Sequence, residues 1–221
     1  MSEVRIPAGD GAKTPFRRGV REHALDAAIR QLTEIGWDQI RFGTIAAQVG
    51  VSRPTLYAEF GNKDGFGEAL VQHEAQRFLT GINAVLDDTQ LDTLSAVKAA
   101  IAFTLVEADQ SPVTRAILTS GTVDGRTSDS LLPFITTRAG PIMASMNGGL
   151  LVWFSRQCVQ TPSEEIAESV DIIVRVVVSH LLVPVGDNKV TTDKISRLAA
   201  RLLPELVASE LKASNGPPTT D

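Results

Sequence analysis

The residues best placed to do chemistry in this sequence are hydrogen-bonding side chains on one face of a short predicted helix. Ser52 is a favourable N-cap, and a first helical turn tolerates a proline, so the sequence predicts a helix that begins at Ser52. Leu56 and Phe60 anchor this helix inward. The outward face carries polar or flat side chains: Arg53, Pro54, Thr55 and Tyr57. A short helix with such a face has the size and the hydrogen-bonding groups to enter a DNA major groove and contact base edges.

A second short helix is predicted directly before this one. Ile45, Ala46 and Val49 place apolar side chains on one of its faces, and Gly50 supplies the positive φ with which a helix can end. Together the two helices form a helix-turn-helix pattern over residues 41–60. An ordinary hairpin of two helices in an all-helical protein is the alternative, because turns that contain glycine are common between helices.

The sequence around this pattern, residues 17–66, resembles the N-terminal DNA-binding domain of the TetR family of transcriptional regulators. The matching residues are Glu34-Ile35-Gly36-Trp37, Ile45-Ala46, Val49-Gly50-Val51-Ser52, Thr55-Leu56-Tyr57, Phe60 and Asn62-Lys63-Asp64. The resemblance implies an all-α fold, in which an N-terminal three-helix domain binds DNA and a C-terminal helical domain binds an effector and dimerises. The expected parts are a disordered arm at 1–16, the DNA-binding domain at 17–64, the effector-binding and dimerisation domain at 65–213, and a disordered tail at 214–221.

Two departures from the family pattern affect the expected contacts. Arg41 stands where the family often has a threonine that caps the second helix and contacts phosphate, so Arg41 or Thr44 would make that contact. Gly65 and Gly67 weaken the start of the fourth helix, because each glycine costs about 1 kcal/mol relative to alanine in a helix interior. The expected DNA-binding residues are Arg17, Arg18, Arg41, Thr44, Ser52, Arg53, Pro54, Thr55, Tyr57 and Lys63.

The charge distribution favours this interpretation although the net charge is −5. Residues 1–63 contain nine Lys and Arg against seven Asp and Glu, whereas the rest contains twelve against nineteen. Arg17, Arg18 and Arg21 cluster at the start of the first helix, where cations oppose the helix dipole and would be better placed facing phosphate. A solvated charged helix end is the alternative.

A long helix is predicted from Asn62 onward, with apolar residues at steps of three and four. No flexible linker separates it from the helix-turn-helix, so it would transmit movement between the two parts of the protein. Further helices are expected at 91–108 and 112–119, followed by a polar loop at 121–130. The capping box that begins at Thr161 predicts the next-to-last helix, and Thr192 is expected to cap the last one.

The apolar segment 131–159 contains prolines and glycines, which predict a helix broken near Gly140. Breaks of this kind leave gaps, so residues in and around them are candidates for lining a cavity for a mostly apolar molecule. Plain core packing is an equally good interpretation of each residue taken singly. The ligand-binding candidates are His73, Phe103, Phe134, Met143, Met146, Asn147, Trp153 and Phe154.

The run from Ile172 to Val183 is apolar nearly all round. We expect it to be a helix despite its β-branched residues, because a capping box precedes it and no other segment pairs with it as a sheet. One subunit of this size is unable to bury such a helix on every face, which predicts a homodimer built on the last two helices. The candidate dimer residues are Val174, Val177, His180, Leu181, Ile195, Leu198 and Leu202.

These features predict a ligand-responsive repressor that binds double-stranded DNA at a palindromic operator and is released by a small hydrophobic effector. The alternatives are a small-molecule binding protein that no longer binds DNA and, third, an enzyme. The three histidines lie on separate predicted helices, the only cysteine is Cys158, and no catalytic motif is present, so no catalytic residue, metal or cofactor is expected. No apolar run of eighteen residues predicts a membrane span, and the expected location is the cytoplasm.

Overall fold

The computed structural model describes residues 13–88, 90–119, 130–184 and 186–207, with the backbone alone for residues 13–17 and 119. Within these ranges every regular element is a helix, as predicted. The elements are α1 (Lys13–Ile35), α2 (Phe42–Val49), α3 (Arg53–Phe60), α4 (Lys63–Leu86), α5 (Thr93–Gln110), α6 (Pro112–Thr119), the 3₁₀ helix η1 (Leu132–Ile135), α7 (Gly140–Gln157), α8 (Ser163–Leu182) and α9 (Asn188–Leu202). Residues 1–12 of the expected arm, residues 121–129 of the expected loop and the expected tail lie outside the described residues, whereas residues 13–16 of the expected arm belong to α1.

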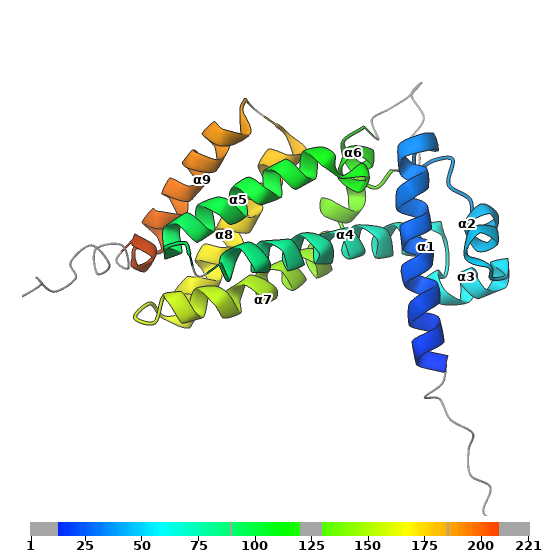
Figure 1. Ribbon diagram of the computed structural model, residues 1–221, viewed down its shortest axis with the longest axis horizontal. Helices are drawn as coiled ribbons and strands as arrows, with labels where there is room; N and C mark the ends of the chain where they lie inside the picture. The colour runs from blue at the N-terminus through cyan, green and yellow to red at the C-terminus, as the bar shows by residue number, and fades with distance from the viewer. Residues whose placement is uncertain (1–12, 89, 120–129, 185, 208–221) are drawn as a thin grey trace, which may run out of the picture.

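Helices α1, α2 and α3 form one end of the molecule, where α1 lies across the end of α4 (Figure 1). Their core contains aliphatic side chains and a group of aromatic rings. Phe66, which belongs to α4, packs edge-on against Phe60 at 4.7 Å and against Phe42 at 5.3 Å between ring centroids. Because Phe66 is fully buried in this group, the first turns of α4 fold as part of the helix-turn-helix unit.

Helix α4 begins as predicted, with Asn62 as its N-cap accepting a hydrogen bond from the Gly65 amide at 2.8 Å. The two glycines that follow are explained by close packing. A Cβ atom at Gly65 would lie 2.2 Å from the carbonyl oxygen of Phe60, and one at Gly67 would lie 2.8 Å from the Phe134 ring and 2.9 Å from the Trp37 ring. Glycine at these two positions therefore lowers the helix propensity of α4, but it allows η1 and the helix-turn-helix unit to pack closely against this helix.

The other end of the molecule is a bundle of α4, α5, α7, α8 and α9 (Figure 1). Helix α4 packs between α5 and α7, α8 packs on α7, and α9 packs mainly on α5. The predicted break is present, because α7 begins at Gly140 after η1. The later pair Gly148-Gly149 does not interrupt α7, and a Cβ atom at Gly149 would lie 2.4 Å from the Leu79 side chain of α4.

Two predicted helix starts are wrong. Helix α8 begins at Ser163 with Pro162 as N-cap, and the Thr161 hydroxyl, expected to cap this helix, donates instead to the Glu205 carboxylate at 2.6 Å. Helix α9 begins at Asn188 with Asp187 as N-cap, which leaves Thr192 buried inside the helix. The expected helix over the β-branched run is present in α8, and α9 ends at Leu202, ahead of Pro204.

Candidate functional site

The exposed end of α3 is shaped by the turn that precedes it. Gly50 ends α2 with φ of 72°, and the Ser52 side chain caps α3 by accepting a hydrogen bond from the Thr55 amide at 3.3 Å. Leu56 is fully buried beneath the helix, whereas Arg53, Pro54 and Tyr57 are exposed. Thr55 is half-buried, and its hydroxyl pairs with that of Ser52 at 2.8 Å. The outward face therefore presents a guanidinium group, a proline ring and a phenol.

Tyr57 and Arg53 are both supported by α2. The Tyr57 ring lies 4.8 Å from the Phe42 ring, and this contact fixes its direction although 46% of the residue is exposed. The Arg53 side chain passes over Gly43, where a Cβ atom would lie 3.5 Å from its Cδ. A flat and well-supported pair of hydrogen-bonding side chains is suited to contact base edges.

Three further predicted DNA-binding residues lie around this face. Arg41 and Thr44 are exposed at the start of α2, and the Arg41 guanidinium donates to the carbonyl oxygens of Asp38 and Ile40. Arg41 makes no side-chain cap of α2. Lys63, at the start of α4, donates to the Asp38 carbonyl oxygen at 3.0 Å. All three residues thus lie at helix starts in the helix-turn-helix unit to which α3 belongs.

The arginines of α1 separate into different roles. Arg18 is exposed, and the side chain of Arg17 lies outside the described residues. Arg21, grouped with them in the sequence, binds Glu59 at 3.2 Å and lies over the Phe60 ring at 5.1 Å. Arg21 therefore ties α1 to α3 rather than extending toward solvent.

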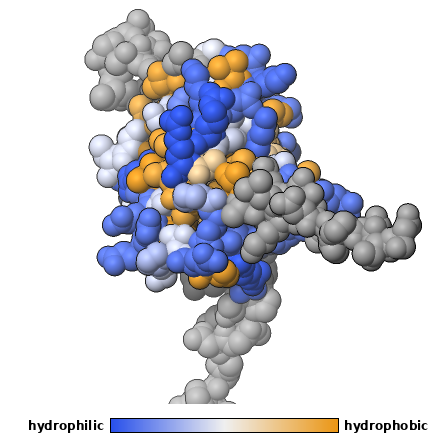
Figure 2. Space-filling model, turned by 90° about the vertical axis from the view of Figure 1, so that its left-hand side faces the viewer, coloured by the Kyte–Doolittle hydropathy of each residue, from blue (hydrophilic) through white to orange (hydrophobic). Residues whose placement is uncertain are grey.

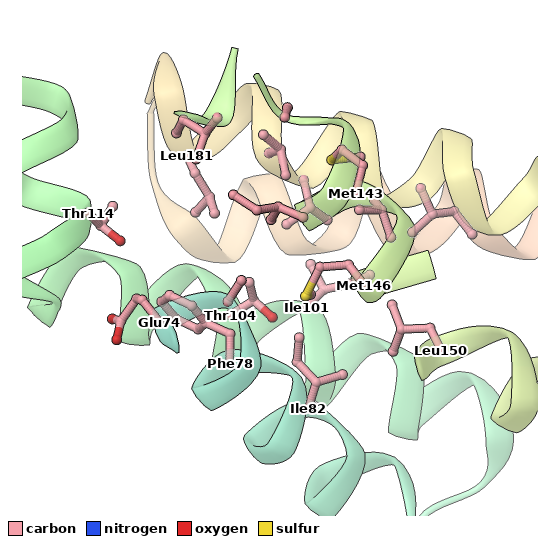
Figure 3. Close-up of a pocket in the computed structure, with 18 of the residues that line it drawn as sticks. Glu74, Phe78, Ile82, Ile101, Thr104, Thr114, Met143, Met146, Leu150 and Leu181 are labelled. Atoms are coloured by element: carbon pink, nitrogen blue, oxygen red, sulfur yellow. The ribbon is translucent and has the colours of Figure 1, made fainter. Parts of the chain in front are cut away.

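A cavity lies among α4, α5, α6, η1, α7 and α8 (Figure 3). The space open to the centres of water-sized molecules is about 160 Å³, and hydrocarbon makes up nearly all of its wall. Three of the predicted ligand-binding residues are on this wall: Met143, Met146 and Phe154.

The other predicted ligand-binding residues are not on the wall, and each has another partner. The Trp153 indole donates to the Leu86 carbonyl oxygen at 3.0 Å, and the Asn147 amide donates to Asp171 at 2.7 Å. His73 faces Asp26 on α1, with 3.8 Å between Nε2 and Oδ1. The position of a residue near a helix break did not predict whether it lines the cavity, because that position does not determine toward which neighbour the side chain points.

Two aromatic candidates occupy close-packing positions instead. Phe134 packs against Gly67, and Phe103 packs against Gly81, where a Cβ atom would lie 2.3 Å from the Phe103 ring. Both rings take up the space that a glycine on α4 leaves, so they join α4 to η1 and to α5.

The polar residues of the cavity, which were not predicted from the sequence, are Glu74, Thr104 and Thr114. Glu74 is buried and binds the Arg77 guanidinium through both carboxylate oxygens, at 3.0 and 3.1 Å. It also accepts a hydrogen bond from Ser111 at the start of α6. The carboxylate of Glu74 raises the pKa of Arg77. A signal was available, because Glu74 falls on the apolar stripe of α4 between Val71 and Phe78.

The predicted dimer residues largely face inward. Val174 and Ile195 are buried in the core of the subunit, and Val177 and Leu181 line the cavity. The His180 ring bonds to the carbonyl oxygen of Val176 in the preceding turn. Leu198 and Leu202 are half-buried on α9. The apolar residues exposed on or beside α8 and α9 are Ile172, Val183 and Val190.

Neither a metal-binding cluster nor a membrane-spanning helix is found in the described part of the chain. No group of three or more metal-binding side chains comes together in it, and none of its helices is long and apolar enough to cross a membrane.

Cys158 is buried, and its burial raises its pKa to about 11, so the thiol is poorly suited to nucleophilic chemistry.

Two family models match the chain. The model for bacterial regulatory proteins of the tetR family matches residues 24–70, and the model for the C-terminal domain of the bacterial tetracyclin repressor matches residues 92–201. The chain belongs to the TetR family. The first match spans the helix-turn-helix unit, and the second spans α5 to α9.

Similar proteins support this assignment over most of the chain. The TetR-family chain is 27% identical to the HTH-type transcriptional regulator AlkX of Mycobacterium tuberculosis, over 86% of each protein. It is 34% identical to the nucleoid occlusion factor SlmA of Photobacterium profundum over 45% of this chain and 50% of SlmA. The fold is that of the TetR-family repressor AlkX from Dietzia sp. strain DQ12-45-1b, implicated in biodegradation of n-alkanes. That structure has a TM-score of 0.69 at 24% identity, over 86% of this chain and 96% of the other.

Proposed function

We propose that this TetR-family regulator is a repressor whose homodimer binds a palindromic operator through α3 and leaves it when an apolar effector fills the cavity. The observation that carries the proposal is the continuity of α4. Its first turns belong to the core of the helix-turn-helix unit through Phe66, and its later turns form a wall of the cavity from Val71 to Leu86. One rigid helix therefore belongs to both sites.

The exposed face of α3 supports base contacts by Arg53 and Tyr57. We propose phosphate contacts for residues around it: Arg18 on α1, Arg41 and Thr44 at the start of α2, Ser52 and Thr55 at the start of α3, and Lys63 at the start of α4, with Pro54 in van der Waals contact. Arg17, whose side chain lies outside the described residues, is expected to join them. Helix starts suit this role, because their free amide groups favour an anion. In a dimer, two α3 helices would have to lie about 34–36 Å apart, or a multiple of this, to enter successive major grooves.

Release from DNA follows from a difference in ligand affinity between two dimer geometries. A ligand shifts such an equilibrium only as far as it binds one state better than the other. A molecule in the cavity would lie against α4, α6 and η1. Helix α6 packs against α1, and η1 packs against α4 beside Trp37. Spreading these elements would therefore change how the helix-turn-helix unit is held.

The dimer surface we propose is the exposed ridge of α8, with α9 beside it. Ile172 and Val183 are apolar and exposed, at 42% and 65%. The neighbouring outward face of α7 adds to this surface, because residues 140–155 contain no charged residue and Val152 is 55% exposed. By contrast, hydrophobic and hydrophilic side chains are interspersed over the end of the molecule at which α9 and the α7–α8 loop lie (Figure 2).

Binding to the DNA upstream of the protein's own gene tests the proposal. Fluorescence anisotropy with labelled duplexes from that region should show saturable binding that an unrelated duplex of equal length fails to compete. The Arg53→Ala/Tyr57→Ala variant should lose this binding while it keeps the helical circular dichroism spectrum. Equal binding to both duplexes, or none to either, would favour a small-molecule binding protein that does not regulate at this site.

A further inference from the structure

We propose that the effector is a chain-like hydrocarbon that carries an uncharged hydroxyl head, and that this head binds at the Glu74 end of the cavity. The proposal rests on the proposed role of the cavity as the effector site and adds the chemical class of the effector. It follows from the shape of the cavity, from the place of its polar groups and from the charges around them.

The shape of the cavity follows α4. Wall residues recur along this helix from Val71 to Leu86, a stretch over which an α-helix rises about 22 Å. Phe78 and Ile82 lie between these two ends. A long apolar space of this kind matches an extended hydrocarbon chain better than a compact ring system, and an apolar cavity favours hydrocarbon over water.

The polar groups of the wall gather at one end (Figure 3). Glu74 and Thr114 lie at this end, and both bond to Ser111, because Ser111 donates to the Glu74 carboxylate and accepts from the Thr114 amide. Thr104 faces the space next to Glu74, and Leu150 lies toward the opposite end (Figure 3). The wall therefore has one polar end and one apolar end, as an amphipathic ligand requires.

The polar end can accept a hydrogen bond from a ligand. One Glu74 oxygen accepts from Arg77 Nη2 and from Ser111, and the other accepts from Arg77 Nε alone. Since a carboxylate has about four acceptor positions, one on the second oxygen is left. The Thr104 hydroxyl donates to Ala100 and keeps acceptor capacity, and the Thr114 hydroxyl has no hydrogen bond to the described residues. These groups suit a hydroxyl head, which both donates and accepts.

The same residues disfavour an effector whose head group is charged. Among the described residues the wall contains no Lys, Arg or His, so a carboxylate head would lie beside Glu74 without a cation from them. Arg77 is not on the wall, and Glu74 and Glu107 already engage it. An ammonium head would approach a carboxylate that the Arg77 guanidinium has already neutralised. Burial of either ion without a partner is costly, whereas a hydroxyl finds partners here.

Isothermal titration calorimetry without DNA tests this inference, with dodecanol, dodecanoate and dodecylamine below their aggregation concentrations. The wild-type dimer should bind dodecanol at least about ten-fold more tightly than either charged analogue. Glu74→Gln removes the negative charge and supplies an amide donor, so the preference for dodecanol over dodecanoate should fall to about two-fold or less. Leu150→Trp, at the apolar end, is the matched control and should weaken all three ligands alike.

Three results would overturn the inference. They are equal binding of dodecanoate and dodecanol to the wild type, a preference that Glu74→Gln leaves unchanged, and no binding of dodecanol to the folded protein. If Glu74→Gln fails to fold, Thr114→Val replaces it and should weaken dodecanol while leaving dodecane unchanged. Anisotropy with operator DNA distinguishes the two proposals, because dodecanol that binds as expected without releasing DNA contradicts the repressor mechanism and leaves the head-group assignment intact.

Discussion

The Lys63 ammonium group lies 5.2 Å from the centre of the Trp37 ring and donates a hydrogen bond to the carbonyl oxygen of Asp38 at 3.0 Å. This contact joins the first turn of α4 to the segment between α1 and α2. It holds the cation next to the start of α2, where Arg41 also binds the Asp38 carbonyl oxygen. Two cations are thereby fixed on one carbonyl group beside the proposed DNA-binding face.

Lys63→Ala should weaken binding to all DNA sequences alike and make the salt dependence shallower by about one unit, because one phosphate contact is lost. The same change should lower the free energy of unfolding by about 1 kcal/mol, through loss of the hydrogen bond and the cation–π contact. Binding isotherms at several salt concentrations, with urea unfolding beside them, measure both effects. An unchanged salt slope together with reduced stability would restrict Lys63 to a structural role.

Gly65→Ala should destabilise the protein by about 1–3 kcal/mol, because a Cβ atom 2.2 Å from the Phe60 carbonyl oxygen forces the backbone to shift. Gly148→Ala is the matched control, since its Cβ would meet no atom within 4 Å and alanine favours a helix by up to about 1 kcal/mol. Thermal unfolding followed by circular dichroism compares the two. Equal melting temperatures for both variants would show that α4 starts differently.

Ile172→Glu should give monomers. A charge buried at a dimer interface without a partner costs about 3 kcal/mol or more, which raises the dissociation constant by about two powers of ten. Val106→Glu, an equally exposed valine on α5, should stay dimeric. Val177→Glu is unsuitable for this test, although Val177 is a predicted dimer residue, because Val177 lines the cavity. Sedimentation velocity measures the oligomeric state of both variants. A dimeric Ile172→Glu protein would place the interface on another surface.

Cys158 should react with iodoacetamide only after unfolding. Burial raises its pKa to about 11, so at pH 8 only about one thiol in a thousand is ionised, and the side chain is inaccessible. Mass spectrometry should find no alkylation of the native protein in minutes and full alkylation in urea. Rapid modification of the native protein would mean that the end of α7 opens readily.

The local order of helices was predictable because short-range signals specify it. Asn62 and Ser52 are N-caps at the positions that their sequence context predicts, and Gly50 ends α2 in the left-handed conformation. The capping box at Thr161 failed because a tertiary partner, Glu205, competes for the threonine hydroxyl. A local pattern contains no information about a residue 44 positions away.

The cavity was only partly predictable. Met143, Met146 and Phe154 were identified from the helix break, but the walls from α4, α5 and α8 depend on which face each helix turns inward. Val177 and Leu181 show the difficulty, since a helix that is apolar nearly all round gives no periodic signal for its inward face. Glu74 was not predicted, because its partner Ser111 lies between α5 and α6, and Glu107, with which it shares Arg77, lies on α5.

The most direct test of the central claim is selection of binding sites from a library of random duplexes, with the wild type and Arg53→Ala compared in parallel. The wild type should enrich an inverted repeat whose half-site centres lie about 10–10.5 base pairs, or a multiple of this, apart. Arg53→Ala should bind that site more weakly by about 1–3 kcal/mol and accept several bases at one position of each half-site. No enriched repeat with the wild type, or the same repeat at unchanged affinity with Arg53→Ala, would contradict a dimer that recognises its operator through α3.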